Sequence, residues 1–309
     1  MRIAVSGATG LIGSALTQRL ARDGQDVVPL VRRLARPGGG GGGGERAIAW
    51  DPARGTIDRA ALEGCEAVVH LAGENIFGRW TAEKKRRIRE SRVAGTRLVS
   101  EAIAGLTRRP RVLLAASAVG YYGDRGAAEL TEETPPGDDF LARLSRDWEA
   151  ATGPAARAGV RVVNLRFGIV LASAGGALAK MLPAFRLGLG GRIGSGAQYF
   201  PWIALEDALG AILHALATES LACPVNVTAP HPVTQLEFVR TLGRVLRRPA
   251  VLPLPSLALR LVFGREAAAM MESGQRVLPA RLLASGYRFR FAELEPALRR
   301  LLGPPDSPL

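Results

Sequence analysis

The sequence predicts an α/β fold in which a doubly wound parallel sheet carries helices on both faces, with a smaller C-terminal lobe for the substrate. Short apolar runs typical of buried strands alternate with longer amphipathic stretches, as they do in repeated strand–helix–strand units. The length of 309 residues suffices for one large α/β domain and a smaller lobe.

The first strand–helix–strand unit occupies the N-terminal part of the chain. The apolar pattern predicts a strand over residues 2–5, a helix that ends at Asp23-Gly24, and a second strand over residues 26–31. The first strand and the helix are joined by residues 6–13, which we call the glycine turn. A glycine-rich turn in this position is typical of a Rossmann-like nucleotide-binding domain.

The glycine turn predicts a phosphate site. Gly7 permits the tight turn, Gly10 lets the backbone approach a pyrophosphate, and Gly13 lets the helix pack closely on the strand. The N–H groups and dipole of the helix N-terminus favour an anion. The neighbouring residues expected to line the cofactor are Thr9, Leu11 and Ile12.

The end of the second strand indicates which cofactor is bound. An NAD site uses an acidic residue there for the ribose 2′-hydroxyl, whereas an NADP site uses arginine for the 2′-phosphate. This chain has Arg32 and Arg33 and no acid at that point, so we expect NADP(H) to be favoured over NAD(H). The alternative is that both arginines are simply solvated in an arginine-rich chain.

The later strands and helices bring further residues to the carboxyl edge of the sheet. Leu71, Ala72 and Gly73, at the end of a strand that begins at Ala67, are expected to line the cofactor crevice, and so is Arg166. The other expected strands are residues 48–51, 112–116, 160–167 and 225–227. The expected helices are a basic segment through Arg92 to Ala104, and residues 140–157, 207–217 and 237–246, the last capped by Thr234.

Composition changes from Gly175 onward, where glycine-rich turns become frequent. We therefore expect an NAD(P)-binding domain over residues 1–230, with substrate-lobe segments interleaved from about residue 175, and a small C-terminal domain over residues 231–309. The run at residues 38–44 is all glycine and is expected to be a loop without chemistry of its own.

Charge and cysteine content narrow the expected partners. The net charge of +13 comes almost wholly from arginine and lacks a nucleic-acid motif, so no nucleic-acid partner is expected. No apolar run is long enough to span a membrane, and no membrane partner is expected. The two cysteines and three scattered histidines predict no metal site, and the expected compartment is the reducing cytoplasm.

The whole chain resembles a subgroup of the atypical short-chain dehydrogenase/reductases, in the NAD(P)-dependent epimerase/dehydratase superfamily, whose members are labelled epimerase family proteins and carry an uncharacterised C-terminal domain. The matching segments are residues 7–13, 70–75, 91–96, 117–123, 140–141, 148–149, 201–203, 207 and 273–279. The resemblance implies an NADP(H)-dependent oxidoreductase or epimerase-like enzyme acting on an unidentified carbonyl or hydroxyl substrate, with a sugar nucleotide as one candidate.

The same resemblance implies a Ser-Tyr-Lys mechanism, in which the tyrosine is the acid/base and the lysine lowers its pKa. The positions expected for the tyrosine and lysine hold Leu141 and Ser145. Ser117 retains the serine and is expected to bind the substrate oxygen. Either Tyr121 or Tyr122 is expected to relay the proton, with Tyr122 pointing into the crevice.

The remaining expectations concern the substrate and the alternative function. The small-molecule substrate is expected beside Glu74, Asn75, Lys85 and Trp202. The missing tyrosine–lysine pair motivates a second hypothesis, an NADP(H)-binding sensor or scaffold without turnover. Whether the protein forms a homodimer is left open.

Overall fold

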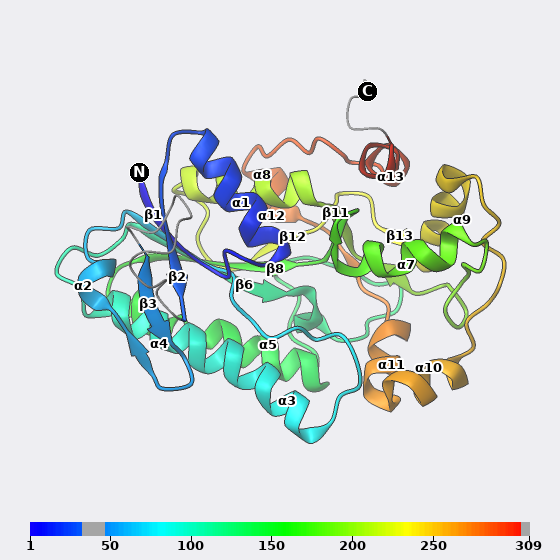
Figure 1. Ribbon diagram of the computed structural model, residues 1–309, viewed down its shortest axis with the longest axis horizontal. Helices are drawn as coiled ribbons and strands as arrows, with labels where there is room; N and C mark the ends of the chain where they lie inside the picture. The colour runs from blue at the N-terminus through cyan, green and yellow to red at the C-terminus, as the bar shows by residue number, and fades with distance from the viewer. Residues whose placement is uncertain (33–46, 304–309) are drawn as a thin grey trace, which may run out of the picture.

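The computed structural model describes residues 1–32 and 47–303, so Arg33 and the glycine run at residues 38–44 lie outside the described residues. Its centre is an eight-stranded sheet in the order β12-β8-β6-β5-β1-β2-β3-β4 (Figure 1). All neighbouring strands pair in parallel except β3 and β4, which are antiparallel. The strands are β1 (Arg2–Ser6), β2 (Asp26–Val31), β3 (Ile48–Asp51), β4 (Thr56–Ile57), β5 (Ala67–His70), β6 (Val112–Ala118), β8 (Arg161–Phe167) and β12 (Val225–Val227).

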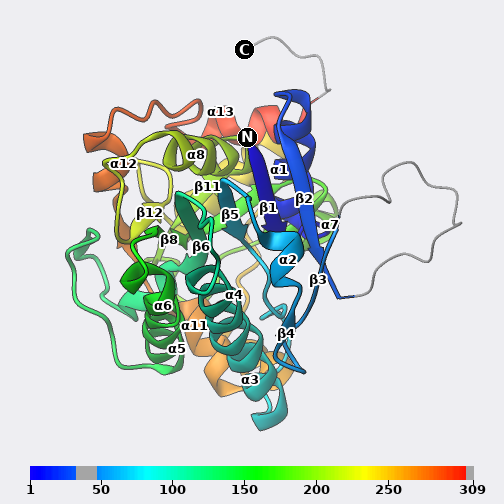
Figure 2. The same cartoon turned by 90° about the vertical axis from the view of Figure 1, so that its left-hand side faces the viewer.

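Helices cover both faces of this sheet, which confirms the predicted fold class (Figure 2). On one face, α1 (Leu11–Arg22) and α8 (Leu205–Ala217) pack on Ile3 and Val5. On the other, α4 (Gly95–Ala104) and α6 (Gly153–Arg157) pack on Ala4. Successive residues of β1 thus enter different core clusters, because side chains alternate between the faces of a strand.

The helical segments largely follow the sequence pattern. The basic segment is continuous through α3 (Ala82–Arg89), a π-helical turn η1 (Glu90–Ala94) and α4. The expected helix over residues 140–157 is instead two helices, α5 (Phe140–Ala150) and α6, because Gly153 and Pro154 begin a new helix after a break. A short helix, α2 (Arg59–Leu62), precedes β5.

The smaller lobe has its own core, which joins residues from both sides of position 230. Thr234 and Glu237 form the predicted capping box of α9. The carboxylate of Asp207 accepts hydrogen bonds from the N–H groups of Arg290 (2.7 Å) and Phe291 (2.8 Å), which fastens the C-terminal segment to α8. The elements of this lobe are β9 (Ile169–Ala172), α7 (Gly176–Arg186), β10 (Tyr199–Phe200), β11 (Trp202–Ala204), β13 (Val233–Thr234), α9 (Gln235–Leu246), α10 (Ser256–Phe263), α11 (Arg265–Glu272), α12 (Ala280–Ala284) and α13 (Leu294–Leu302).

Two short connections complete the carboxyl edge of the sheet. A 3-10 turn, η2 (Val119–Tyr122), follows β6 directly. Further along, β7 (Glu129–Leu130) pairs in parallel with β14 (Arg276–Val277) and so ties this edge to the C-terminal segment. Within residues 1–32 and 47–303, no helix combines the length and apolar character that crossing a membrane requires.

Candidate functional site

The glycine turn joins the carboxyl end of β1 to α1, and two of its glycines are required by the fold. Gly7 has φ +71°, and a Cβ there would lie 2.8 Å from the carbonyl carbon of Leu71. A Cβ on Gly13 would lie 2.1 Å from the carbonyl oxygen of Gly7. Gly10 differs, because it is exposed and a Cβ there would meet only the Gly7 oxygen, at 3.3 Å. The face of Gly10 is therefore open for a ligand.

The backbone beside Gly10 presents hydrogen-bond donors. The first N–H groups of a helix have no intrahelical acceptor, and among the described residues no side chain caps α1. The first turn of α1 also carries no acidic residue, so nothing there repels an anion. This arrangement fits a pyrophosphate.

Ser6 and His70 fasten the glycine turn to the end of β5. The Ser6 hydroxyl lies 2.7 Å from Nδ1 of His70 and accepts hydrogen bonds from the N–H groups of Leu71 (3.1 Å) and Ala72 (3.2 Å). Burial lowers the pKa of His70 to about 4, so the imidazole is neutral near pH 7. The predicted cofactor residues Leu71 and Ala72 thus lie directly beside Gly7.

A hollow of about 400 Å³ lies at the ends of β2 and β3. Arg32 is exposed at this hollow, and Trp50 and Asp51 contribute to its wall. An arginine in this position, next to the strand that carries the glycine turn, suits a phosphorylated ribose.

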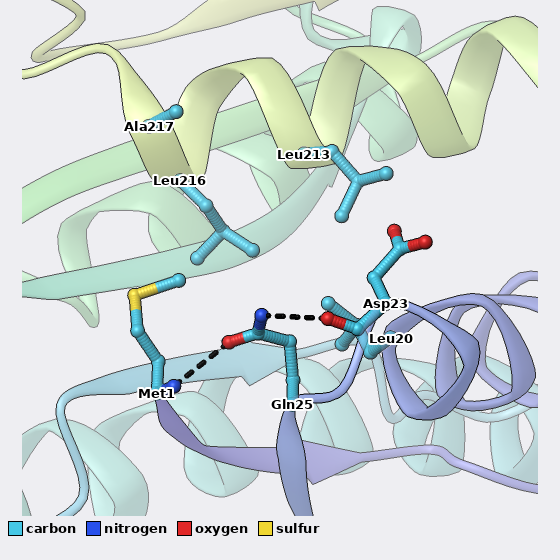
Figure 3. A pocket seen from close by; sticks show the side chains of 7 residues that line it. All are labelled: Met1, Leu20, Asp23, Gln25, Leu213, Leu216 and Ala217. Atoms are coloured by element: carbon cyan, nitrogen blue, oxygen red, sulfur yellow. Dashed lines mark hydrogen bonds between the residues drawn. The ribbon is translucent and has the colours of Figure 1, made fainter.

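A second hollow lies between the C-terminal ends of α1 and α8 and is shown in Figure 3. Its volume is about 100 Å³, and leucines and one alanine form much of its wall. The Met1 ammonium donates to Oε1 of Gln25 (2.8 Å), whose amide in turn donates to the Asp23 carbonyl (3.1 Å). This hollow lies at the amino end of β1, opposite the glycine turn, and we assign no chemistry to it.

Five polar side chains form what we call the strand-end cluster, at the carboxyl ends of β6, β8 and β12. The Arg166 guanidinium holds the Glu149 carboxylate in a two-pronged ion pair, with N–O distances of 2.7 and 2.8 Å. Ser117 donates to the same carboxylate at 2.6 Å. The members are Ser117, Tyr122, Glu149, Arg166 and Asn226. The expected cofactor residue Arg166 is therefore committed to internal bonds and is only 2% exposed.

Tyr122 lies inside this cluster, which corrects the expectation that it points into the crevice. It is fully buried, donates to Oδ1 of Asn226 (2.6 Å) and accepts from Arg166 (3.0 Å). Burial raises its pKa to about 12. The 3-10 turn η2 gives the two adjacent tyrosines different environments, and only Tyr121 is half-buried.

Tyr121 stacks on the guanidinium of Arg166, whose central carbon lies 3.5 Å from the ring centroid. Its hydroxyl has no hydrogen-bond partner among the described residues. Nearby, Leu141 packs against Gly120, where a Cβ would come within 3.2 Å of it, and Ser145 is buried. The positions expected for the tyrosine and lysine are thus filled by packed side chains.

The expected substrate residues lie in different surroundings. Glu74 forms an ion pair with Lys84 at 2.8 Å, and Asn75 accepts from the N–H of Phe77 at 2.8 Å. Lys85 reaches α11, where it pairs with Glu266 at 2.9 Å. Trp202 is 1% exposed in the core of the smaller lobe, because β11 pairs with β9 there, so its ring does not line a surface site.

Sequence reasoning gave no role to Glu149, Asn226 or Arg92, although two of them stand in segments that carried the resemblance. Arg92, from η1, donates to the Glu74 carbonyl (2.9 Å) and lies where a Cβ on Gly73 would touch it, at 3.4 Å. Burial lowers its pKa to about 10. Within the described ranges, no group of three or more metal-ligating side chains comes together.

Comparisons with known proteins identify the family of the chain. Residues 3–227 match the NAD dependent epimerase/dehydratase family, and residues 254–301 match a domain of unknown function, DUF1731. Human epimerase family protein SDR39U1 is 41% identical over 306 residues, which cover 98% of this chain and 100% of the human protein. Epimerase family protein MT2273 of Mycobacterium tuberculosis is 42% identical over 297 residues, or 96% of each chain.

Solved structures show the same fold. The crystal structure of human epimerase family protein SDR39U1 (isoform 2) with NADPH has a TM-score of 0.87 at 41% identity, covering 97% of this chain and 99% of that one. A nucleoside-diphosphate sugar epimerase from Corynebacterium glutamicum has a TM-score of 0.79 at 35% identity, covering 98% of this chain and 58% of that one.

Proposed function

The chain belongs to the NAD dependent epimerase/dehydratase family, and from this premise we propose that it is an NADP(H)-dependent oxidoreductase or epimerase-like enzyme. The single observation that carries the proposal is the glycine turn, with its open face at Gly10 and its uncapped helix N-terminus. The substrate is a carbonyl or hydroxyl compound, with a sugar nucleotide as the first class to try.

NADP(H) is favoured over NAD(H) in this proposal because of Arg32. Its guanidinium lies at the hollow beside Trp50 and Asp51, and it is exposed, so it is available to a 2′-phosphate. NADPH in the human relative's structure supports the same choice. When bound, the nicotinamide ring supplies the hydride chemistry, and the protein's part is to hold and orient the reactants.

Tyr121 is the proposed proton-transfer group, because its hydroxyl is the one of the adjacent pair that no described residue engages. Arg166 and Tyr122 act as positioning residues, since Arg166 stacks under the Tyr121 ring and Tyr122 bonds to Arg166. Ser117 donates its proton to Glu149 and is therefore oriented rather than free. Glu74 and Asn75, in the loop after β5, and Lys85 of α3 form one side of the proposed substrate site.

The alternative function is NADP(H) binding without turnover, as a sensor or scaffold. It is favoured by the commitment of Ser117, Glu149 and Arg166 to one another, and by Leu141 and Ser145 at the positions of the usual pair. A cofactor that binds only the folded state would then stabilise the fold without chemistry.

One pair of measurements separates these functions. NADPH and NADH affinities are measured by fluorescence titration, and carbonyl substrates, including nucleoside-diphosphate-activated ketosugars, are screened by following NADPH absorbance. Turnover that disappears in Tyr121→Phe supports the enzyme. Tight NADPH binding with no turnover on any substrate supports the sensor, and the absence of NADPH binding contradicts both.

A further inference from the structure

Helix α10 lies at one corner of the smaller lobe (Figure 1). Large apolar side chains are exposed on this helix and on the loops before it. Together with the arginines named below, we call them the leucine–arginine face. On α10, Leu257 is 68% exposed and Leu261 is 71% exposed, whereas Leu259 on the inner side is 2% exposed. The apolar members are Leu187, Leu189, Val251, Leu252, Leu254, Leu257, Leu261 and Val262.

Backbone hydrogen bonds hold the two loops of this face side by side. The N–H of Leu252 donates to the Gly190 carbonyl (3.2 Å), and the N–H of Leu254 donates to the Arg192 carbonyl (2.8 Å). The strip over residues 251–254 then leads directly into α10. The exposed leucines of the two loops therefore lie in neighbouring segments, and the second loop continues into α10.

The charged residues of the segments that carry this face are all arginines, and the acid that follows them, Glu266, is paired with Lys85. The segments 186–192 and 247–265 contain no aspartate or glutamate. Among the described residues, no aspartate or glutamate forms an ion pair with an arginine of these two segments. The arginines are Arg186, Arg192, Arg247, Arg248, Arg260 and Arg265. Apolar area bordered by unpaired guanidinium groups is complementary to a surface that offers both negative charge and an apolar interior.

We propose that the leucine–arginine face docks on the surface of an anionic lipid bilayer. The leucines of α10 enter the boundary between headgroups and acyl chains, and the arginines bind the anionic headgroups. A second copy of this chain is a poor occupant, because a symmetric contact would bring the same arginines against each other. The proposal goes beyond the sequence analysis, which expected no membrane partner.

The helices α10 and α11 contact the segment that follows β5, which carries the proposed substrate residues. The ring of Phe263 at the end of α10 packs edge-to-face on Phe77, at 5.5 Å between centroids, and Lys85 pairs with Glu266 of α11. Both Phe77 and Lys85 belong to the segment that follows β5 and carries the proposed substrate residues. Docking through α10 would therefore bring one wall of the proposed substrate site near the bilayer, with α10 and α11 between them.

The test is co-sedimentation of the full chain with vesicles of phosphatidylcholine alone and with vesicles containing about one-third phosphatidylglycerol. We expect binding to the anionic vesicles only. Leu257→Ser with Leu261→Ser should weaken that binding at least ~10-fold, because the inserted apolar area is lost. The matched control is Leu283→Ser, which removes a half-exposed leucine from α12, away from this face, and should bind like the wild type.

A second variant separates docking from general electrostatic attraction. Arg260→Gln with Arg265→Gln should weaken binding and reduce its salt dependence, while Arg19→Gln with Arg22→Gln, on α1, should not. If the serine variant does not fold, as judged by circular dichroism, the arginine pair decides. Vesicle binding that is equal in all variants would reflect only the net charge and would overturn the proposal. So would the absence of vesicle binding, or a dimer in sedimentation equilibrium that the serine variant dissociates.

Discussion

The glycine turn and the strand-end cluster both stand at the carboxyl edge of the same sheet, but they use their polar groups in opposite ways. In the glycine turn, the N–H groups at the start of α1 receive no side-chain cap from the described residues, and the face of Gly10 is open. In the strand-end cluster, Arg166 is bonded to Glu149 and Tyr122, and almost none of it is exposed.

This difference shows that a place at the edge of a parallel sheet does not by itself make a side chain available to a ligand. Availability depends on whether the chain's own groups already satisfy the donors and acceptors. We therefore propose that the glycine turn serves cofactor binding and that the strand-end cluster serves first to stabilise the fold. Substitutions in the glycine turn should therefore mainly affect cofactor binding, and substitutions in the strand-end cluster should mainly affect stability.

The largest effect is expected from Arg166→Met, which would leave the Glu149 carboxylate without its cation in a largely buried place. Removing one partner of a buried ion pair costs about 3–5 kcal/mol of unfolding free energy. Urea unfolding of the wild type and of Arg166→Met measures this loss of unfolding free energy. The control is Arg19→Met, which breaks an exposed pair with Asp23 and should change stability little. An equal, small loss in both variants would mean that the strand-end cluster is not a stabilising unit.

The glycine turn should show a pH dependence through His70. Its folded pKa of about 4 lies below the unfolded value of 6.5, so the unfolded chain binds a proton first as the pH falls. The contribution of His70 to the free energy of unfolding is therefore complete above pH 6.5. It falls by about 3 kcal/mol between pH 6.5 and 4 and does not change further below pH 4. Urea titrations of the wild type and His70→Asn should differ by this slope, and identical slopes would exclude His70 as the cause.

We expect Tyr121 to affect catalysis and Tyr122 to affect stability. Tyr121→Phe should lower kcat about 100-fold, the lower end for a lost proton-transfer group, with unchanged stability. Tyr122→Phe should instead lower stability, because Asn226 and Arg166 lose a buried partner. This order reverses what the sequence suggests. A larger loss of kcat in Tyr122→Phe than in Tyr121→Phe would restore the original assignment.

Gly10→Val should weaken NADPH binding about 30-fold, because a branched side chain would occupy the open face and block roughly 2 kcal/mol of hydrogen bonds to the phosphates. Fluorescence titration gives the affinity, and circular dichroism should report an unchanged fold. Gly13→Ala is the matched contrast. Its Cβ would meet the Gly7 carbonyl oxygen at 2.1 Å, so that variant should lose stability. Unaltered NADPH affinity in Gly10→Val would remove the glycine turn from the cofactor site.

The contrast between the regions also explains what the sequence could predict. The glycine turn is local, because Gly7, Gly10 and Gly13 act within one turn and its flanking strand and helix. The strand-end cluster joins Ser117, Glu149 and Asn226, which are far apart in the chain, and no spacing rule links them. The burial of Tyr122 and Trp202 likewise depends on tertiary packing that their neighbours in sequence do not reveal.

The smallest effect is expected at Arg32, because an exposed arginine in water gains only part of the energy of a buried one. Arg32→Ala should lower the affinity for NADPH about 10-fold, or ~1.4 kcal/mol, while leaving that for NADH nearly unchanged. The control for the loss of one positive charge is Arg22→Ala. Arg22 is exposed at the end of α1 that lies away from the glycine turn. Equal losses for NADPH and NADH would mean that Arg32 attracts both dinucleotides without reading the 2′-phosphate. The hollow beside Trp50 and Asp51 would then set only how the adenosine end lies, and the preference for NADP(H) would need another residue.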